Sequence, residues 1–342
     1  MRESNKKVLI ILLNIFAIVG NLFSTLSIIA VTLLAPYVEE FNEILKGTEI
    51  SLVSQIILVC VCIILNILCI IFSKNIEKNK SKIVLCTTIS MMCGTILNVI
   101  IGFISIIAIY KKNKEAKEEH EIPVLEEIKV KGLNKVIYAS LFVFIFIVSY
   151  TSIIANVIKD WNIWIRVVSI YLIQILCLSL PFMKNLKRDI KAFWINKKQY
   201  FNEIVKTLSM IVLFYIPTAL VLKLIIGEST NQTLIKDLPI GFTLVLATII
   251  APFCEEIMFR GFLRKIFKND KVFIVISALI FGIIHCLYIE QNWLMYLHII
   301  PYAIMGAGFA KIYAKTDNIF TNMSIHFLWN IIAFCSMLLL GI

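Results

Sequence analysis

Long apolar runs separated by short polar segments make up most of the chain. Runs of about 20 residues, long enough to cross a bilayer as a helix, recur along all 342 residues. They lie near 8–35, 50–73, 83–110, 136–158, 162–182, 207–226, 239–263, 272–289, 292–314 and 318–341. This pattern predicts an all-α fold, a polytopic transmembrane helical bundle of about ten membrane segments.

Composition supports a membrane protein. Hydrophobic residues make up 60% of the chain, whereas soluble domains average about 45–50%. The net charge of +11 comes from lysines and arginines grouped between apolar runs, which is typical of cytoplasmic loops rather than of nucleic-acid binding. We therefore expect a lipid bilayer as the surroundings and no nucleic acid as a partner. The richness in Ile, Lys and Asn favours a bacterial cell membrane.

One charged stretch divides the chain. It lies at 111–135 and is the longest interruption of the apolar pattern. We predict an accessory N-terminal membrane region at 1–115, with about three apolar segments, followed by a charged cytoplasmic linker at 116–135. The remaining residues, 136–342, form the domain that carries the polar motifs, with a motif core at 239–342.

Lysine and arginine counts orient the segments. The loop 183–206 carries seven basic residues and is expected to be cytoplasmic. If each later segment crosses the membrane once, the charges of every later loop agree with the side on which that loop falls. The N-terminal part conflicts, because a single crossing by 83–110 places the lysine-rich 111–135 outside. Two readings remain open: a re-entrant hairpin broken near Gly94, or a loop that departs from the charge rule.

Three of the apolar runs contain ionisable and amide side chains. The first motif is Pro252–Gly261, with Glu255, Glu256 and Arg260; the others are Phe281–His285 and His326–Asn330. An ionisable residue at the centre of a bilayer costs roughly 2.5–3.5 kcal/mol on insertion scales. Their grouping in neighbouring segments therefore indicates a buried functional site rather than anchoring.

Helical spacing separates their roles. Glu256 and Arg260 are four residues apart, so they share a helix face and can pair, while Glu255 points about 100° away and is available for chemistry. Counted from the nearest predicted cytoplasmic helix end, Glu255 and His326 each lie nine residues in, roughly 13 Å. His285 lies fourteen residues in, roughly 21 Å. These depths predict one site that opens toward the cytoplasmic half of the membrane.

Two chemistries fit these residues. A buried carboxylate beside an imidazole can activate a water molecule, and a second histidine with a carboxamide can donate hydrogen bonds to a developing oxyanion. Alternatively, a divalent metal such as zinc is held by glutamate and histidine. The ligands would then be Glu255, Glu256, His285 and His326. Asparagine is a poor zinc ligand and no HExxH motif is present, so we favour the metal-free reading and leave the metal open.

The three motifs resemble those of a known family. Pro252–Gly261 resembles the EExxxR motif of the CPBP intramembrane proteases, the type II CAAX endopeptidase (CAAX prenyl protease 2-like) and bacteriocin-processing family. Phe281–His285 is similar to its FxxxH motif and His326–Asn330 to its HxxxN motif. Asp317 stands in the preceding turn, where many members have glycine.

The resemblance implies a role for each matched residue. Glu255 and His285 would activate the water, and His326 with Asn330 would form the oxyanion pocket. Glu256 and Arg260 would brace the site.

An intramembrane endopeptidase that acts on a small peptide or a membrane-protein substrate is therefore our first hypothesis. The alternative is a non-catalytic member of the same family, a bacteriocin self-immunity protein or a membrane scaffold. A transporter is disfavoured, because neither an inverted repeat nor a pair of broken helices is evident.

Overall fold

The computed structural model of the chain describes residues 3–34, 37, 52–110, 135–150, 160–227, 240–287 and 293–340. Within these ranges the ordered elements are helices and no strand occurs, so the predicted all-α fold is confirmed. Six of the described helices are long and apolar enough to cross a membrane, and shorter apolar helices accompany them. The predicted linker at 116–135 lies outside the described residues, except for Lys135 at the start of α6.

The chain divides into two units, residues 1–120 with 331–342 and residues 121–330. The first unit contains α1 (Glu3–Leu34), α3 (Leu52–Phe72), η1 (Ser73–Asn75), α4 (Ile76–Cys93) and α5 (Ile96–Tyr110). The second contains α6 (Lys135–Tyr150), α8 (Ile163–Ile195), α9 (Lys197–Ile226), α11 (Ile240–Val245), η2 (Leu246–Ile250), α12 (Ala251–Glu256), η3 (Ile257–Phe262), α13 (Leu263–Ile266), α14 (Asp270–Ile284), η4 (Trp293–His298) and α15 (Ile299–Thr316). It also holds the first part of α16 (Ile319–Leu340).

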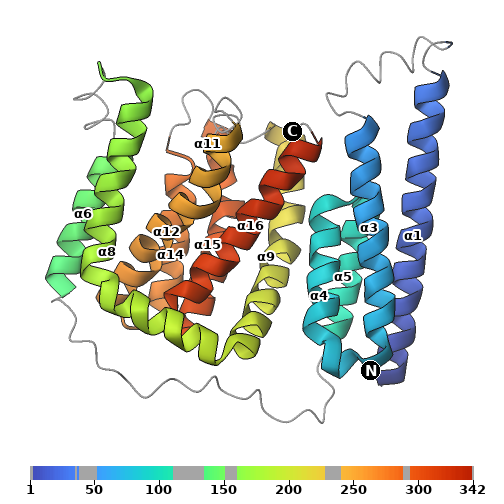
Figure 1. The fold of residues 1–342 in the computed structure, drawn as a ribbon, viewed down its shortest axis with the longest axis horizontal. Coiled ribbons are helices and arrows are strands. Elements are labelled where there is room, and N and C mark those ends of the chain that lie inside the picture. The colour runs from blue at the N-terminus through green and yellow to red at the C-terminus, as the bar shows by residue number, and fades with distance from the viewer. Residues whose placement is uncertain are drawn as a thin grey trace. The chain divides into compact units, whose positions relative to one another are not determined.

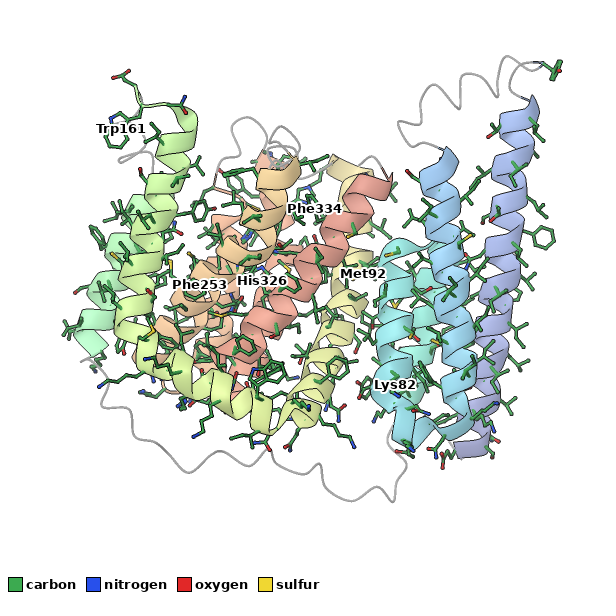
Figure 2. The ribbon with its side chains drawn as sticks, viewed as in Figure 1. Lys82, Met92, Trp161, Phe253, His326 and Phe334 are labelled. Atoms are coloured by element: carbon green, nitrogen blue, oxygen red, sulfur yellow. The ribbon has the colours of Figure 1, made fainter. Side chains whose placement is uncertain are left out.

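Helices α4 and α5 form a hairpin where the sequence shows one apolar run. The chain leaves the helical conformation between Cys93 and Ile96, as the first of the two open readings of this segment requires. The Nζ atom of Lys80 lies 4.6 Å from the ring centroid of Tyr110, which places the start of α4 beside the end of α5 (Figure 1). Lys82 marks this end of α4 in Figure 2. The two ends of the hairpin therefore lie close together, which agrees with the re-entrant reading of 83–110.

The predicted loop at 183–206 is helical instead. Helix α8 is 33 residues long and contains Pro181, and near this proline it turns to run along the base of the second unit toward α9 (Figure 1). Proline removes a helical hydrogen bond and commonly bends a helix. The basic residues that suggested a loop therefore lie on the last part of α8 and on the start of α9.

The helix with the EExxxR motif is wound irregularly. Two π-helical turns, η2 and η3, flank the α-helical residues Ala251–Glu256. Pro252 lacks the N–H that the carbonyl of Thr248 would accept in a regular α-helix, which favours a wider turn just before it. Single π-helical turns are frequent at functional sites, and here they determine how Glu255, Glu256 and Arg260 project from one helix.

Glycines bring α14 and α15 close together. A Cβ atom on Gly282 would lie 2.8 Å from the carbonyl oxygen of Ile299, and one on Gly306 would lie 3.1 Å from the Cα of Ala278. Small residues allow helix backbones to approach closely within membranes. This close packing positions the motif residue Phe281 and its neighbours against α15.

Candidate active site

The predicted ion pair of the first motif is present. Arg260 Nη1 lies 3.1 Å from Glu256 Oε1, and neither side chain is exposed to solvent. Arg260 Nη2 also donates to the carbonyl oxygen of Gly306 at 3.3 Å. The guanidinium lies 4.5 Å from the ring centroid of Phe281 and 5.2 Å from that of Phe309. The buried cation is therefore held by a carboxylate, a carbonyl and two aromatic faces.

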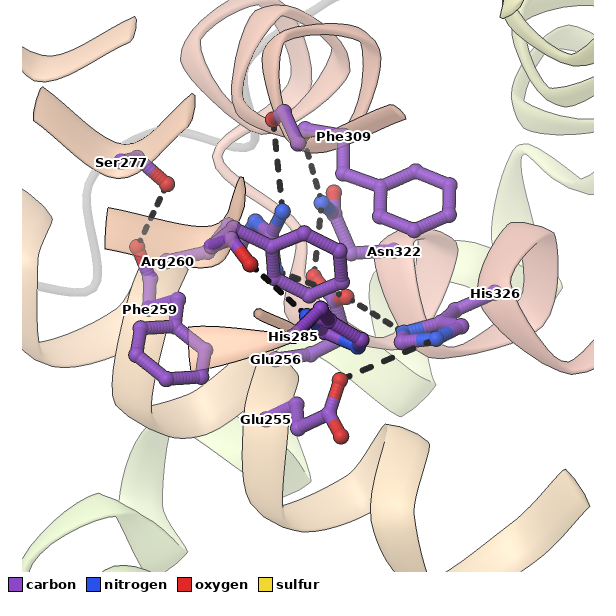
Figure 3. A network of polar contacts seen from close by, with 11 residues as sticks. Glu255, Glu256, Phe259, Arg260, Ser277, His285, Phe309, Asn322 and His326 are labelled. Carbon is purple, nitrogen blue, oxygen red and sulfur yellow. Dashed lines mark hydrogen bonds and ion pairs between the residues drawn. The ribbon is translucent and has the colours of Figure 1, made fainter. Parts of the chain in front are cut away.

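Glu256 has a second function that its spacing to Arg260 does not reveal. Its Oε1 lies 2.7 Å from His326 Nδ1, and its Oε2 accepts a hydrogen bond from Asn322 Nδ2 at 3.2 Å (Figure 3). Asn322 also donates to the carbonyl oxygen of Phe309 at 2.7 Å. A carboxylate that already pairs with arginine can only accept, so the Nδ1 atom of His326 carries the hydrogen. Glu256 thus fixes the orientation of the His326 ring.

Glu255 points toward the other ring nitrogen of His326. Its Oε2 lies 3.9 Å from His326 Nε2, and its side chain is 15% exposed (Figure 3). The same oxygen is buried and makes no hydrogen bond to the described residues. A buried acceptor without a partner is costly and is common where a reacting group binds. This carboxylate is therefore the acidic group that the structure leaves available for chemistry.

His285 lies at the end of α14, where its ring is held by backbone and by aromatic contacts. Its Nδ1 lies 2.7 Å from the carbonyl oxygen of Phe281, and a carbonyl only accepts, so Nδ1 carries the hydrogen. The ring stacks on Tyr302, with centroids 4.6 Å apart and planes 20° apart. Phe281 packs on it at 4.4 Å. In neutral His285 the Nε2 atom is therefore a hydrogen-bond acceptor.

Asn330 lies one turn beyond His326 on α16. Its Nδ2 donates to the carbonyl oxygen of Ala247 at 2.7 Å, inside the π-helical turn η2. A carboxamide nitrogen carries two hydrogens, so this bond orients the side chain and leaves the second hydrogen for another acceptor. The three motifs thus meet in one region of the second unit.

The turn before α16 is built around two residues. Asp317 has a left-handed backbone with φ of 43°, a region that favours glycine. Arg188 stabilises it, donating to the carbonyl oxygen of Asp317 at 2.7 Å. Asn318 then accepts from the backbone N–H of Thr321 at 2.8 Å and starts the helix. These contacts stabilise a residue other than glycine at the left-handed position of the turn.

The four proposed metal ligands do not form a metal site in the described part of the chain. No group of three His, Cys, Asp or Glu side chains there is arranged to hold a metal ion. Both oxygens of Glu256 are already engaged, with Arg260, His326 and Asn322. Zinc needs at least three protein ligands, so we derive no step through a metal.

Sequence reasoning missed two neighbours of the motif residues. Asn322 precedes His326 by four residues, so its place on the same helix face was readable from spacing. Tyr302 carries no such signal, because it meets His285 only through the packing of α14 against α15. Likewise, the pair that the structure brings to ion-pair distance is Glu255 with His326, whereas the sequence suggested Glu255 with His285.

Comparison with known proteins identifies the class. Residues 238–332, which include all three motifs, match the family model for type II CAAX prenyl endopeptidase Rce1-like proteins. This part of the chain is therefore similar to the domain of that endopeptidase family, which agrees with the resemblance of the three motifs to CPBP proteases. The described helices and this match together indicate a multi-pass helical membrane protein with a region similar to membrane peptidases.

Individual relatives agree with this class. UPF0177 protein YxdF of Lactococcus lactis is 29% identical over 163 residues, 45% of this chain and 84% of YxdF. UPF0177 protein YvdC of the same species is 36% identical over 106 residues, 30% of this chain and 38% of YvdC. "Putative membrane peptidase YdiL" of Bacillus subtilis is 30% identical over 108 residues, 30% of this chain and 41% of YdiL. The matched region thus spans less than half of YvdC and of YdiL, and no solved structure matches the chain.

Proposed function

We propose that this protein is an intramembrane endopeptidase that hydrolyses a peptide bond with water activated by Glu255. The observation that carries the proposal is the buried Glu255 Oε2, which has no hydrogen-bond partner in the described part of the chain and faces His326 Nε2 at 3.9 Å. Two atoms at this separation can both hydrogen-bond to a single oxygen about 2.8 Å from each. A water molecule there can donate to the Glu255 carboxylate and accept from His326 Nε2.

The fixed orientations of the two histidine rings support a separate role for each polar residue of the site. Glu255 takes one proton from the water as the water oxygen attacks the substrate carbonyl. The other hydrogen stays on that oxygen and donates a hydrogen bond to His285 Nε2, which orients the water. His326 Nε2 and the second amide hydrogen of Asn330 donate to the developing oxyanion. Protonated Glu255 then delivers its proton to the leaving amine. No covalent intermediate with the protein is required.

The charges of the cluster support His326 as a donor. Glu256 and Arg260 form a pair with no net charge, which leaves the carboxylate of Glu255 uncompensated. His326 Nε2 lies 3.9 Å from Glu255 Oε2, so a hydrogen on Nε2 faces that carboxylate and lowers the cost of burying it.

The substrate is a small peptide or a membrane-protein segment that enters from the cytoplasmic side. The orientation of the site in the membrane is inferred from basic residues that lie at one end of the second unit. Two contacts bring helix ends together there: Arg188 lies 3.2 Å from Asp317, and Lys315 lies 2.9 Å from Glu203. Positive charge favours the cytoplasmic face.

Comparative peptidomics tests the activity. Membranes that contain the wild-type chain, Glu255→Gln or Glu77→Gln are compared for released peptides; Glu77 is an exposed residue of the first unit and serves as the matched control. We expect the wild type and the control to release the same peptides, and Glu255→Gln to lower release by about 10²-fold or more. Full release by a folded Glu255→Gln variant would refute the proposal. No released peptide from any variant would instead favour the non-catalytic immunity or scaffold alternative.

Treatment with a metal chelator distinguishes the mechanism in which Glu255 activates water from the mechanism that uses a bound metal ion. We expect cleavage of a peptide found in this way to continue after treatment with 1,10-phenanthroline, because the described residues do not group three metal ligands. Loss of activity that added zinc restores would establish the metal mechanism instead.

A further inference from the structure

The half of α8 that follows Pro181 carries features that the proposed active site does not use. This segment, 183–195, runs along the base of the second unit toward α9, at the ends of the other helices (Figure 1). We call it the interfacial segment. Its place and its sequence both suit the boundary between the hydrocarbon and the headgroups of a bilayer.

The interfacial segment has three distinct faces. One face is buried against the unit and consists of Asn185, Leu186, Asp189 and Ala192. A second face is apolar and exposed: Met183 is 40% exposed, Ile190 41% and Trp194 62%. A third face is basic and exposed and consists of Lys184, Lys187 and Lys191. At 3.6 residues per turn the members of each face project in similar directions, and the apolar face lies next to the basic face.

Adjacent apolar and basic faces are the signature of a helix that lies in a membrane interface. The apolar face enters the acyl boundary, and the lysines then lie at the level of the lipid phosphates. Tryptophan is enriched at this depth. The sole acidic residue of the segment, Asp189, is 1% exposed and lies on the buried face, so the exposed surface of the segment is basic without an intervening carboxylate.

The segment is held rigidly to the rest of the unit. Asp189 Oδ2 accepts a hydrogen bond from the backbone N–H of Ile319 at 2.8 Å, and Asn318 Nδ2 donates to the carbonyl oxygen of Asp189 at 2.8 Å. The ring of Phe193 packs edge-on against Phe320 with centroids 5.0 Å apart. A surface fixed in this way loses little conformational entropy when a ligand binds.

We propose that the exposed basic face of the interfacial segment, Lys184, Lys187 and Lys191, binds the headgroups of anionic phospholipids. The general preference of basic loops for the cytoplasm does not predict lipid binding here. That preference concerns charge alone, whereas the interfacial segment also has an exposed apolar face beside its lysines. The proposal is independent of whether the protein is a peptidase.

Native mass spectrometry of the full chain tests the proposal. The purified protein in detergent receives equal amounts of phosphatidylglycerol and phosphatidylcholine, and the retained lipids are counted. The site variant replaces Lys184, Lys187 and Lys191 with glutamine. The matched control replaces three exposed lysines around α4, Lys74, Lys78 and Lys82, and changes the net charge by the same amount.

We expect the wild type and the control to retain phosphatidylglycerol in preference to phosphatidylcholine. The site variant should lose this preference by more than about tenfold, since each lysine near an anionic surface contributes roughly fivefold. Equal losses in both variants, or an unchanged preference in the site variant, would overturn the proposal. If the site variant is not monodisperse, the wild type is measured alone at increasing ionic strength. A preference for phosphatidylglycerol that does not fall with added salt would then overturn the proposal.

Discussion

Replacement of Arg260 by methionine gives the sharpest test of how the buried charges are balanced. The substitution keeps the length of an apolar stem but removes the cation that lies 3.1 Å from Glu256. The Glu256 carboxylate then stays buried, with His326 and Asn322 as its remaining partners. Breaking a buried pair by removal of one partner typically costs about 3–5 kcal/mol. We expect Arg260→Met to lower the free energy of unfolding by this amount.

The loss of stability in Arg260→Met has more than one source. Arg260 contributes a hydrogen bond to Gly306 and two aromatic contacts besides the ion pair. Removal of the carboxylate as well, in Glu256→Gln with Arg260→Met, leaves no unpaired charge in the pair. We therefore expect the double variant to be more stable than Arg260→Met alone.

Thermal unfolding in detergent, followed by the loss of the monodisperse peak in size-exclusion chromatography, measures the effect. A loss of about 3 kcal/mol lowers the Tm by roughly 4 °C in a chain of 342 residues, since the unfolding entropy is about 2.1 cal/mol/K per residue. Arg264→Met is the matched control, because Arg264 pairs with Asp270 at 2.6 Å at the exposed end of the same helix. Exposed pairs contribute about 0–1 kcal/mol. Equal Tm values for the two single variants would refute the reasoning.

Three further outcomes follow from the site. Asn322→Ala should lower kcat about 10- to 100-fold with KM unchanged, because it removes a hydrogen bond to the Glu256 carboxylate. In a Glu256→Gln background the same substitution should lower kcat little further, and additive losses would contradict this coupling. Tyr302→Phe should retain activity and Tyr302→Leu should lose kcat, since the ring stacks on His285; equal activities would show that the stack is not needed. Gly282→Ala should lower the free energy of unfolding by about 1–3 kcal/mol, because the added Cβ would lie 2.8 Å from a carbonyl oxygen of α15; an unchanged Tm would show that the two helices separate without cost.

Much of the site follows from helical spacing. Residues four apart on one helix face the same direction whatever surrounds them, so the pairing of Glu256 with Arg260 was predictable, and so was the common face of His326 and Asn330. The membrane character was predictable for an equally local reason, because apolar runs of spanning length have few alternatives to a transmembrane helix.

Other features needed the assembled bundle. The bend of α8 at Pro181 converts a predicted basic loop into a helix along the base, since a proline permits a bend but does not determine its direction. The hairpin of α4 and α5 was one of two readings of 83–110, and charge alone did not decide between them.

The sequence by itself determined the membrane-embedded helical class, the family motifs and the polar side chains for which we propose a chemical role. These properties depend on composition and on spacing within single helices. Only the tertiary structure decided that Glu256 holds His326, that Asn322 completes this contact, and that Tyr302 stacks on His285. These partners lie on different helices or act through a residue on another helix, so their meeting depends on how the helices pack and turn about their axes.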